Sequence, residues 1–191
     1  TKVKNHVPVL VDTSRSMTLT ANGDAESRAD LAKTAFQALG LPESLTDDNH
    51  IYHVLTFGSQ LEEIPSGALK DTVFDAPNSD IGAALVEVKR RYQDVELGGI
   101  ILLSDGTDTG GMGSRIRMDE PLDETSQNLV ASLGAPINAV AVGDPTKLRD
   151  LAIKRVKHDD FAFVRNKVSI DVEVQAIGFD GEVVQARLER A

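Results

Sequence analysis

Small polar side chains with hydroxyl or carboxylate oxygens follow directly after the first apolar run of the 191-residue chain. Asp12, Ser14 and Ser16 occupy alternate positions, so their side chains can converge in an extended turn. Ser79 stands just before a helical pattern, and Asp105 follows a later apolar run. Such oxygen atoms are the ligands that hard divalent cations prefer. The five residues together predict a site for Mg²⁺, with Mn²⁺ or Ca²⁺ as alternatives.

Each of the three segments also has an ordinary explanation when it is taken alone. Ser and Asp are common turn formers at strand ends, and Asp105-Gly106 is a turn sequence. Ser79 is suited to cap the helix that follows it. It is the joint occurrence of the three segments at strand ends that favours a metal site.

A cation held mainly by hydroxyl groups, with the carboxylates acting through water, keeps part of its positive charge. It would attract a carboxylate from outside into its open coordination position. The residues therefore predict a module that recognises a partner protein through an Asp or Glu side chain of that partner.

The elements that must position these residues alternate along the first 150 positions. Continuous apolar runs predict strands buried on both faces, as in parallel sheets, and apolar residues at helical spacing predict helices between them. The predicted strands are 6–12, 51–57, 98–105 and 137–144, and the predicted helices are 26–39, 80–92 and 122–133. We expect an α/β fold with a doubly wound, mostly parallel sheet and helices on both faces. The irregular stretch 59–76 is expected to hold a short edge strand.

In such a sheet, ligands bind at the carboxyl ends of the strands, which is where the polar segments lie. Residues 1–150 are therefore interpreted as a metal-binding domain. Residues 151–191 are expected to be a short β extension, because 168–176 alternate strictly between apolar and polar side chains. Asp180-Gly181 predicts a turn, with 182–189 as the returning strand. We interpret the extension as the truncated start of a β-sandwich domain; the alternative is a hairpin packed on the first domain.

Composition excludes several classes of function. The chain has 30 acidic and 20 basic residues, a net charge of −10, which argues against binding to nucleic acid or to an anionic membrane. The absence of cysteine excludes disulfides, thiolate metal sites and cysteine nucleophiles. No apolar run reaches the length of a membrane span, and no signal peptide is visible. Because no Met begins the chain, we expect a piece of a longer gene product; its oligomeric state stays open.

Three motifs carry a resemblance to a known family: DTSRSM at 12–17, SDIGAAL at 79–85 and LSDG at 103–106. Over about residues 3–150 the chain resembles the von Willebrand factor type A (vWA) domain with its metal-ion-dependent adhesion site (MIDAS). The resemblance implies a doubly wound sheet with one antiparallel edge strand, a bound Mg²⁺ or Mn²⁺, and metal-bridged protein recognition. Asp12, Ser14 and Ser16 match the first motif and Asp105 the third. The second loop most often carries Thr in this family; Ser79 keeps the hydroxyl.

A second resemblance is carried by GDPTKLRDLAIKRV at 143–156 and the β-rich pattern after it. This combination is similar to bacterial membrane-anchored proteins in which a vWA domain precedes a sandwich-like domain and a glutamine-amidotransferase-like region. The resemblance implies a membrane-anchored bacterial parent of which this chain is a soluble fragment. Without cysteine, the fragment itself has no amidotransferase nucleophile.

The expectation is a binding module and not an enzyme. The competing hypothesis is a Mg²⁺-dependent phosphohydrolase of the haloacid-dehalogenase type with Asp12 as nucleophile. That chemistry requires a second carboxylate two residues later, where this chain has Ser14. A third reading keeps the vWA fold and gives the site a purely structural role.

Overall fold

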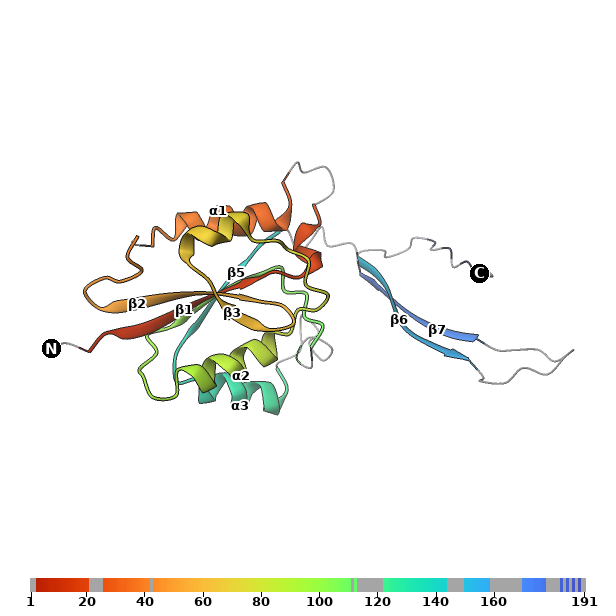
Figure 1. Cartoon of the computed structure of the whole chain (residues 1–191). Helices are drawn as coiled ribbons and strands as arrows, with labels where there is room; N and C mark the ends of the chain where they lie inside the picture. Colours follow the sequence, from red (N-terminus) through yellow and green to blue (C-terminus); the bar gives the residue numbers. More distant parts are fainter. Residues whose placement is uncertain are drawn as a thin grey trace, which may run out of the picture. The chain divides into compact units, whose positions relative to one another are not determined.

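Two β-sheets form in the described parts of the chain, one in each of two compact units, Thr1–Gly143 and Asp144–Ala191 (Figure 1). The computed structural model describes residues 3–20, 26–41, 43–110, 112, 122–143, 150–158 and 170–177, together with residues 183, 185, 187 and 189. None of the helices within these ranges is long and apolar enough to cross a membrane.

The sheet of the first unit has five strands in the order β3-β2-β1-β4-β5. These strands are β1 (Asn5–Asp12), β2 (His50–Phe57), β3 (Leu61–Glu63), β4 (Ile100–Ser104) and β5 (Ile137–Ala141). All neighbours pair in parallel except β3, which runs antiparallel to β2 at the edge. The predicted α/β class with a mostly parallel sheet is confirmed, and β3 is the short edge strand expected within 59–76.

Helices cover both faces of this sheet (Figure 1). They are α1 (Arg28–Ala38), α2 (Ile81–Arg91) and α3 (Glu124–Ser132), with short 3₁₀ helices η1 (Arg15–Thr18) and η2 (Ser66–Asp71). Successive residues of β1 point to opposite faces, so Leu10 packs in the core beneath α2 while Val9 packs in the core beneath α1. Both residues are completely buried. The core therefore consists of two layers that share the central strand.

Local signals in the sequence explain where the helices begin and end. Ser27 and Asp30 form a capping box at the start of α1, and Asp123 caps α3 by accepting a hydrogen bond from the Ser126 N–H. Beyond the other ends of these helices stand Gly40 and Gly134, with φ of 59° and 65°. This left-handed conformation ends a helix at little cost only for glycine.

The second unit contains an antiparallel pair, β6 (Asp150–His158) and β7 (Ile170–Ile177). The strand predicted at 168–176 is present as β7, and its partner here is β6, which the sequence did not predict. A register shift between Ile153 and Arg155 interrupts the alternation of β6, so no clear period of two could be read. The predicted turn Asp180-Gly181 lies outside the described residues, as does most of 182–189.

One face of this pair carries apolar side chains that remain exposed. Ile153 is paired with Val174, and Val156 with Val172, so these side chains share a face. Their exposed fractions are 45–67%. A two-stranded hairpin with an uncovered apolar face is marginal in water. The hypothesis that 151–191 begin a β-sandwich domain stays a prediction.

Candidate metal centre

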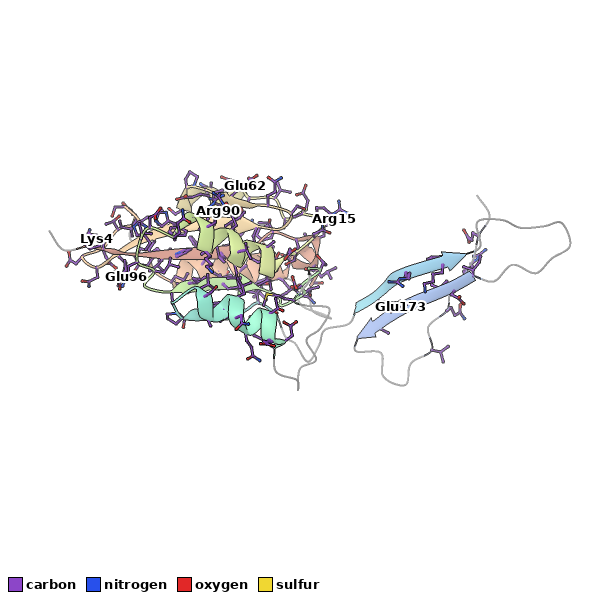
Figure 2. All side chains as sticks on the ribbon, turned by 90° about the horizontal axis from the view of Figure 1, so that it is seen from below. Lys4, Arg15, Glu62, Arg90, Glu96 and Glu173 are labelled. Carbon is purple, nitrogen blue, oxygen red and sulfur yellow. The ribbon has the colours of Figure 1, made fainter. Side chains whose placement is uncertain are left out.

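The predicted site residues lie at the carboxyl edge of the five-stranded sheet. β1 ends at Asp12 and the neighbouring parallel strand β4 ends at Ser104, with Val11 paired to Leu103. The loop that leads into α2 brings Ser79 to the same edge. Figure 2 shows Arg15, the first residue of η1, and Lys4, near the start of β1, at opposite ends of the first unit.

Asp12 is the centre of a buried hydrogen-bond network. Its Oδ1 accepts the Ser14 N–H at 2.9 Å, and its Oδ2 accepts the hydroxyls of Ser79 at 2.9 Å and Ser104 at 2.7 Å. The residue has no exposed surface. Burial raises the pKa of Asp12, while the hydrogen bonds from Ser14, Ser104 and Ser79 act in the opposite direction. The site thus holds a carboxylate away from water with neutral donors alone.

Ser14 immediately precedes η1, and Ser16 is the second residue of this short helix. Their Oγ atoms are 2.9 Å apart. Two neighbours hold this segment in place. The backbone N–H of Arg15 donates to the Ala76 carbonyl at 3.0 Å, and the Met17 side chain is fully buried. The two hydroxyls are therefore fixed beside Asp12 by contacts of their neighbours.

Ser79 does not cap α2, although its position before the helix suits a cap. The cap is Asp80, whose Oδ1 accepts the Ala83 N–H at 2.8 Å, so the Ser79 hydroxyl is free to donate to Asp12. Thr109 holds the backbone of Ser79 from both sides: its Oγ1 accepts the Ser79 N–H at 2.9 Å and donates to the Ser79 carbonyl at 3.0 Å. Thr109 was not predicted from the sequence, because no motif marks it.

Asp105 joins the network through an arginine. Its Oδ1 accepts the Thr107 N–H at 2.9 Å, and its Oδ2 accepts Nη1 of Arg28 at 2.5 Å. The same Nη1 approaches the Ser16 carbonyl at 3.3 Å. All five predicted residues thus lie in one connected network at the sheet edge. Ser104 and Arg28 complete it; Arg28 was missed because it is 77 positions away from Asp105.

The donor set and its spacing fit a small divalent cation. Oxygen ligands about 2.0–2.1 Å from an octahedral Mg²⁺ are separated by about 2.8–3.0 Å when they occupy adjacent positions. Ser14 Oγ and Ser16 Oγ, two of the candidate ligands, are 2.9 Å apart. No group of three or more His, Cys, Asp or Glu side chains within the described ranges forms a metal cluster. The candidate centre consists of three hydroxyls and two carboxylates, so it does not depend on a cluster of three such side chains.

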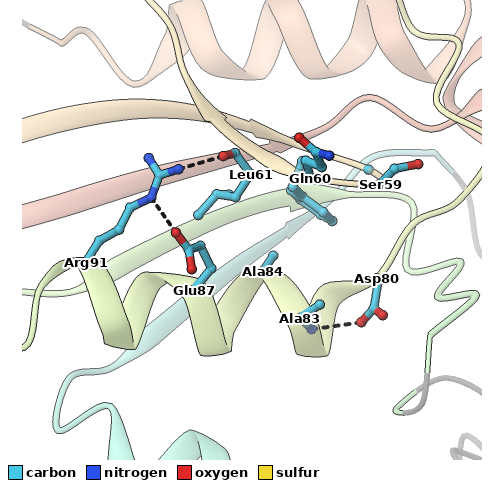
Figure 3. A pocket seen from close by; sticks show the side chains of 10 residues that line it. Ser59, Gln60, Leu61, Asp80, Ala83, Ala84, Glu87 and Arg91 are labelled. Carbon is cyan, nitrogen blue, oxygen red and sulfur yellow. Dashed lines mark hydrogen bonds and ion pairs between the residues drawn. The ribbon is translucent and has the colours of Figure 1, made fainter.

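A cleft of 380 Å³ lies next to the centre, between α2 and the segment that joins the end of β2 to β3 (Figure 3). Asp80, the neighbour of Ser79, lines its near end. At the far end Arg91 donates to Glu87 Oε1 at 3.0 Å and to the Leu61 carbonyl at 2.7 Å. Arg91 and Glu87 are hydrogen-bonded within the cleft wall, so we assign no further cation ligand to the cleft.

The chain was compared with known proteins. No protein-family model matches it, and no curated protein matches it. An aerotolerance-related membrane protein from Bacteroides fragilis is similar in structure, with a TM-score of 0.52 at 18% identity over 88% of this chain and 81% of that chain. BatB from Bacteroides thetaiotaomicron gives a TM-score of 0.46 at 17% identity, over 75% of this chain and 93% of that chain.

Proximal thread matrix protein 1 from the mussel byssus, solved with a zinc-occupied MIDAS motif, gives a TM-score of 0.48 at 17% identity. The match covers 72% of this chain and 38% of that protein, so the chain spans well under half of its length. At these identities structural similarity establishes the fold alone. The evidence for the fold is the similarity to the Bacteroides fragilis protein, whose TM-score is 0.52. With the sheet order, the antiparallel edge strand and the helices on both faces, it confirms the expected architecture: the chain has the fold of a vWA domain.

Proposed function

We propose that the chain is a metal-dependent protein-recognition module, in which a bound divalent cation bridges to an Asp or Glu side chain of a partner protein. The observation that carries the proposal is the network around Asp12. A carboxylate with no exposed surface receives three hydrogen bonds from neutral donors, and within the described residues it pairs with no cationic side chain. Burying a charge in this way is unfavourable unless a further charge compensates it.

In this proposal Ser14, Ser16 and Ser79 hold the cation directly, while Asp12 and Asp105 act mostly through water. When bound, the cation supplies a Lewis-acidic position that accepts an external carboxylate. Ser104 and Thr109 keep Asp12 and Ser79 in place. Mg²⁺ is the ion that the hydroxyl-rich donor set favours, with Mn²⁺ as a close substitute.

We further propose that the module works without catalysis and belongs to a membrane-anchored bacterial parent protein. A phosphohydrolase with Asp12 as nucleophile requires an exposed carboxylate, whereas Asp12 is buried and its Oδ2 accepts two hydroxyls. Position 14, where a general acid would stand, is a serine. A phosphatase assay with a generic aryl phosphate is expected to give no turnover that depends on Asp12.

The decisive experiment is a calorimetric titration of the whole chain with Mn²⁺, followed by acetate as a minimal carboxylate probe. Wild type is expected to bind Mn²⁺, and the loaded protein to bind acetate. The pair Ser14→Ala/Ser16→Ala is expected to lose both. Ser132→Ala is the matched control, because the Ser132 hydroxyl donates to the Leu129 carbonyl on exposed α3.

Equal Mn²⁺ binding by wild type and the Ser14→Ala/Ser16→Ala pair would refute the metal centre. Mn²⁺ binding without any acetate binding would leave the cation with a structural role and refute the recognition function.

A further inference from the structure

Arg28 is a buried cation inside a centre that is built to receive another cation. It is the first residue of α1 and only 8% exposed. Its guanidinium lies 2.5 Å from Asp105 Oδ2, and Asp105 has a side-chain exposure of 1%. Gly143, after β5, lies against the Arg28 stem: a Cβ at that position would come within 3.4 Å of Arg28 Cγ and Nε. Loops after β4 and β5 thus enclose this side chain.

The stability of α1 does not explain an arginine at this position. The N-terminus of a helix carries a partial positive charge, which disfavours a cation in the first turn. The capping box of Ser27 and Asp30 already satisfies this end of the helix. Buried ion pairs also contribute little net stability when compared with apolar side chains of similar size. The placement of Arg28 therefore calls for an explanation in the centre itself.

The charges of the centre provide that explanation. The formal charges of Asp12 and Asp105 sum to −2, and Arg28 reduces the sum to −1. With a divalent cation bound, the centre keeps one net positive charge; without Arg28 it would be neutral. A positive centre holds its cation less tightly and attracts an anionic ligand more strongly.

We propose that Arg28 is an internal counter-cation that lowers the affinity of the centre for the metal and raises its affinity for the partner's carboxylate. Its guanidinium weakens cation binding and leaves the loaded centre with the positive charge that captures an anion. This inference rests on the proposed function and specifies how the same site sets its two affinities.

The test measures Mn²⁺ and acetate binding to the Arg28→Gln variant. Arg28→Gln is expected to bind Mn²⁺ about tenfold more tightly than wild type, and its loaded form to bind acetate about tenfold more weakly. Arg28→Lys keeps the charge and is expected to stay within a few-fold of wild type in both. Arg90→Gln is the matched control, because it removes an equal charge on the exposed face of α2, where Arg90 pairs with Glu87.

A second comparison separates charge from positioning and covers the case in which Arg28→Gln does not fold. Arg28→Gln is combined with Asp105→Asn, so that no buried charge is left unpaired. Asp105→Asn alone is the reference, because it leaves Arg28 no carboxylate to position. Compared with this reference, the pair lacks only the charge of Arg28, and it is expected to bind Mn²⁺ about tenfold more tightly. Circular dichroism and thermal melting report whether each variant is folded.

Several outcomes would overturn the inference. A folded Arg28→Gln variant with unchanged or weaker Mn²⁺ binding would show that Arg28 only positions Asp105. Mn²⁺ binding by the double variant that is no tighter than that of Asp105→Asn alone would show that the charge of Arg28 does not set the metal affinity. If wild type bound Mn²⁺ and acetate while Arg28→Gln bound both equally well, only this inference would fail. If wild type bound no Mn²⁺, the proposed function would fail with it.

Discussion

The two halves of the five-stranded sheet neutralise their polar side chains in different ways. At the carboxyl end, Asp12 is buried among hydroxyls and Asp105 against Arg28. In the amino-terminal half, on the face that α2 covers, His6 and His53 stack with ring centroids 5.1 Å apart and a contact of 2.8 Å between His6 Nδ1 and His53 Nε2. His53 Nδ1 in turn lies 2.9 Å from Glu63 Oε1.

The difference shows which end of the sheet contains a buried charge that its own side chains do not compensate. The imidazoles can be neutral, they partner one another, and Tyr92 at the end of α2 packs edge-on against His53 at 5.2 Å. At the other end, Asp105 is paired with Arg28, whereas the Asp12 carboxylate is buried in its charged form or must take up a proton. The same sheet thus buries polar side chains that satisfy one another. The burial of an uncompensated carboxylate at Asp12 is therefore specific to the candidate metal centre and is not required by the fold.

The largest effect is expected from Asp105→Leu, which leaves the Arg28 guanidinium buried without its partner. Breaking one side of a buried pair costs about 3–5 kcal/mol. The free energy of unfolding, measured by urea titration with circular dichroism, should fall by this amount. A loss below about 1 kcal/mol would mean that Arg28 reaches water easily, and the contrast between the two ends would weaken.

Asp12→Asn is expected to abolish Mn²⁺ binding with little loss of stability. Asparagine can accept from the Ser14 N–H through its oxygen and donate to the Ser79 and Ser104 hydroxyls through its amide. Because a buried charge disappears, the urea midpoint should stay or rise, while Mn²⁺ affinity falls by about a hundredfold or more. A strongly destabilised variant that still binds Mn²⁺ would contradict this assignment.

The histidine half of the sheet should make stability depend on pH. Burial, and then the charge of His53, lower the pKa of His6 below its ordinary value of 6.5. The unfolded chain therefore takes up this proton at a higher pH than the folded chain does. The stabilisation is complete above pH 6.5 and is lost as the pH falls through 6.5 towards the folded value.

Urea unfolding between pH 7.5 and 5.5 measures this dependence. The groups that face His6 are His53 on β2 and Tyr92 at the end of α2, and burial raises the pKa of Tyr92, so it stays neutral in this range. His6→Gln is expected to flatten the slope. An identical slope in wild type and His6→Gln would assign the dependence to other groups.

The smallest effect is expected from Glu63→Gln, which removes the carboxylate beside His53. The Glu63 side chain is 52% exposed, so solvent screens the pair. The free energy of unfolding should change by less than about 1 kcal/mol. A change comparable with that of Asp105→Leu would show that the two halves of the sheet do not differ as described.

Much of the first unit could be predicted because its elements follow local rules. Continuous apolar runs marked β1, β2, β4 and β5, and the glycines after α1 and α3 marked helix ends. The predicted bounds differ from the observed ones by a few residues. The strand expected at 98–105 occupies Ile100–Ser104, while β1 and β2 each begin one residue earlier than predicted. The β6 strand was missed because a bulge hides its period.

The site was predictable only where it depends on residues close in sequence. The alternation of Asp12, Ser14 and Ser16 is visible in the chain, and strand ends indicated where Ser79 and Asp105 would meet them. The partners that satisfy them come from elsewhere. Arg28 reads as part of an amphipathic helix and Thr109 as a loop residue, because their roles depend on contacts 77 and 30 positions away.

The central place of β1 has a consequence for how the chain folds. β1 is synthesised before the other four strands of this sheet, and its neighbours are β2 and the much later β4. The hydrogen bond between Ser104 and Asp12 joins residues 92 positions apart. Pairings between such distant segments are slow to form, because closing a long loop costs chain entropy before any contact compensates it. A nascent chain that lacks β4 therefore leaves Asp12 without one of its donors and one whole edge of β1 unpaired. The centre is complete only when β4 has docked, so cation binding during refolding would report a late step of folding.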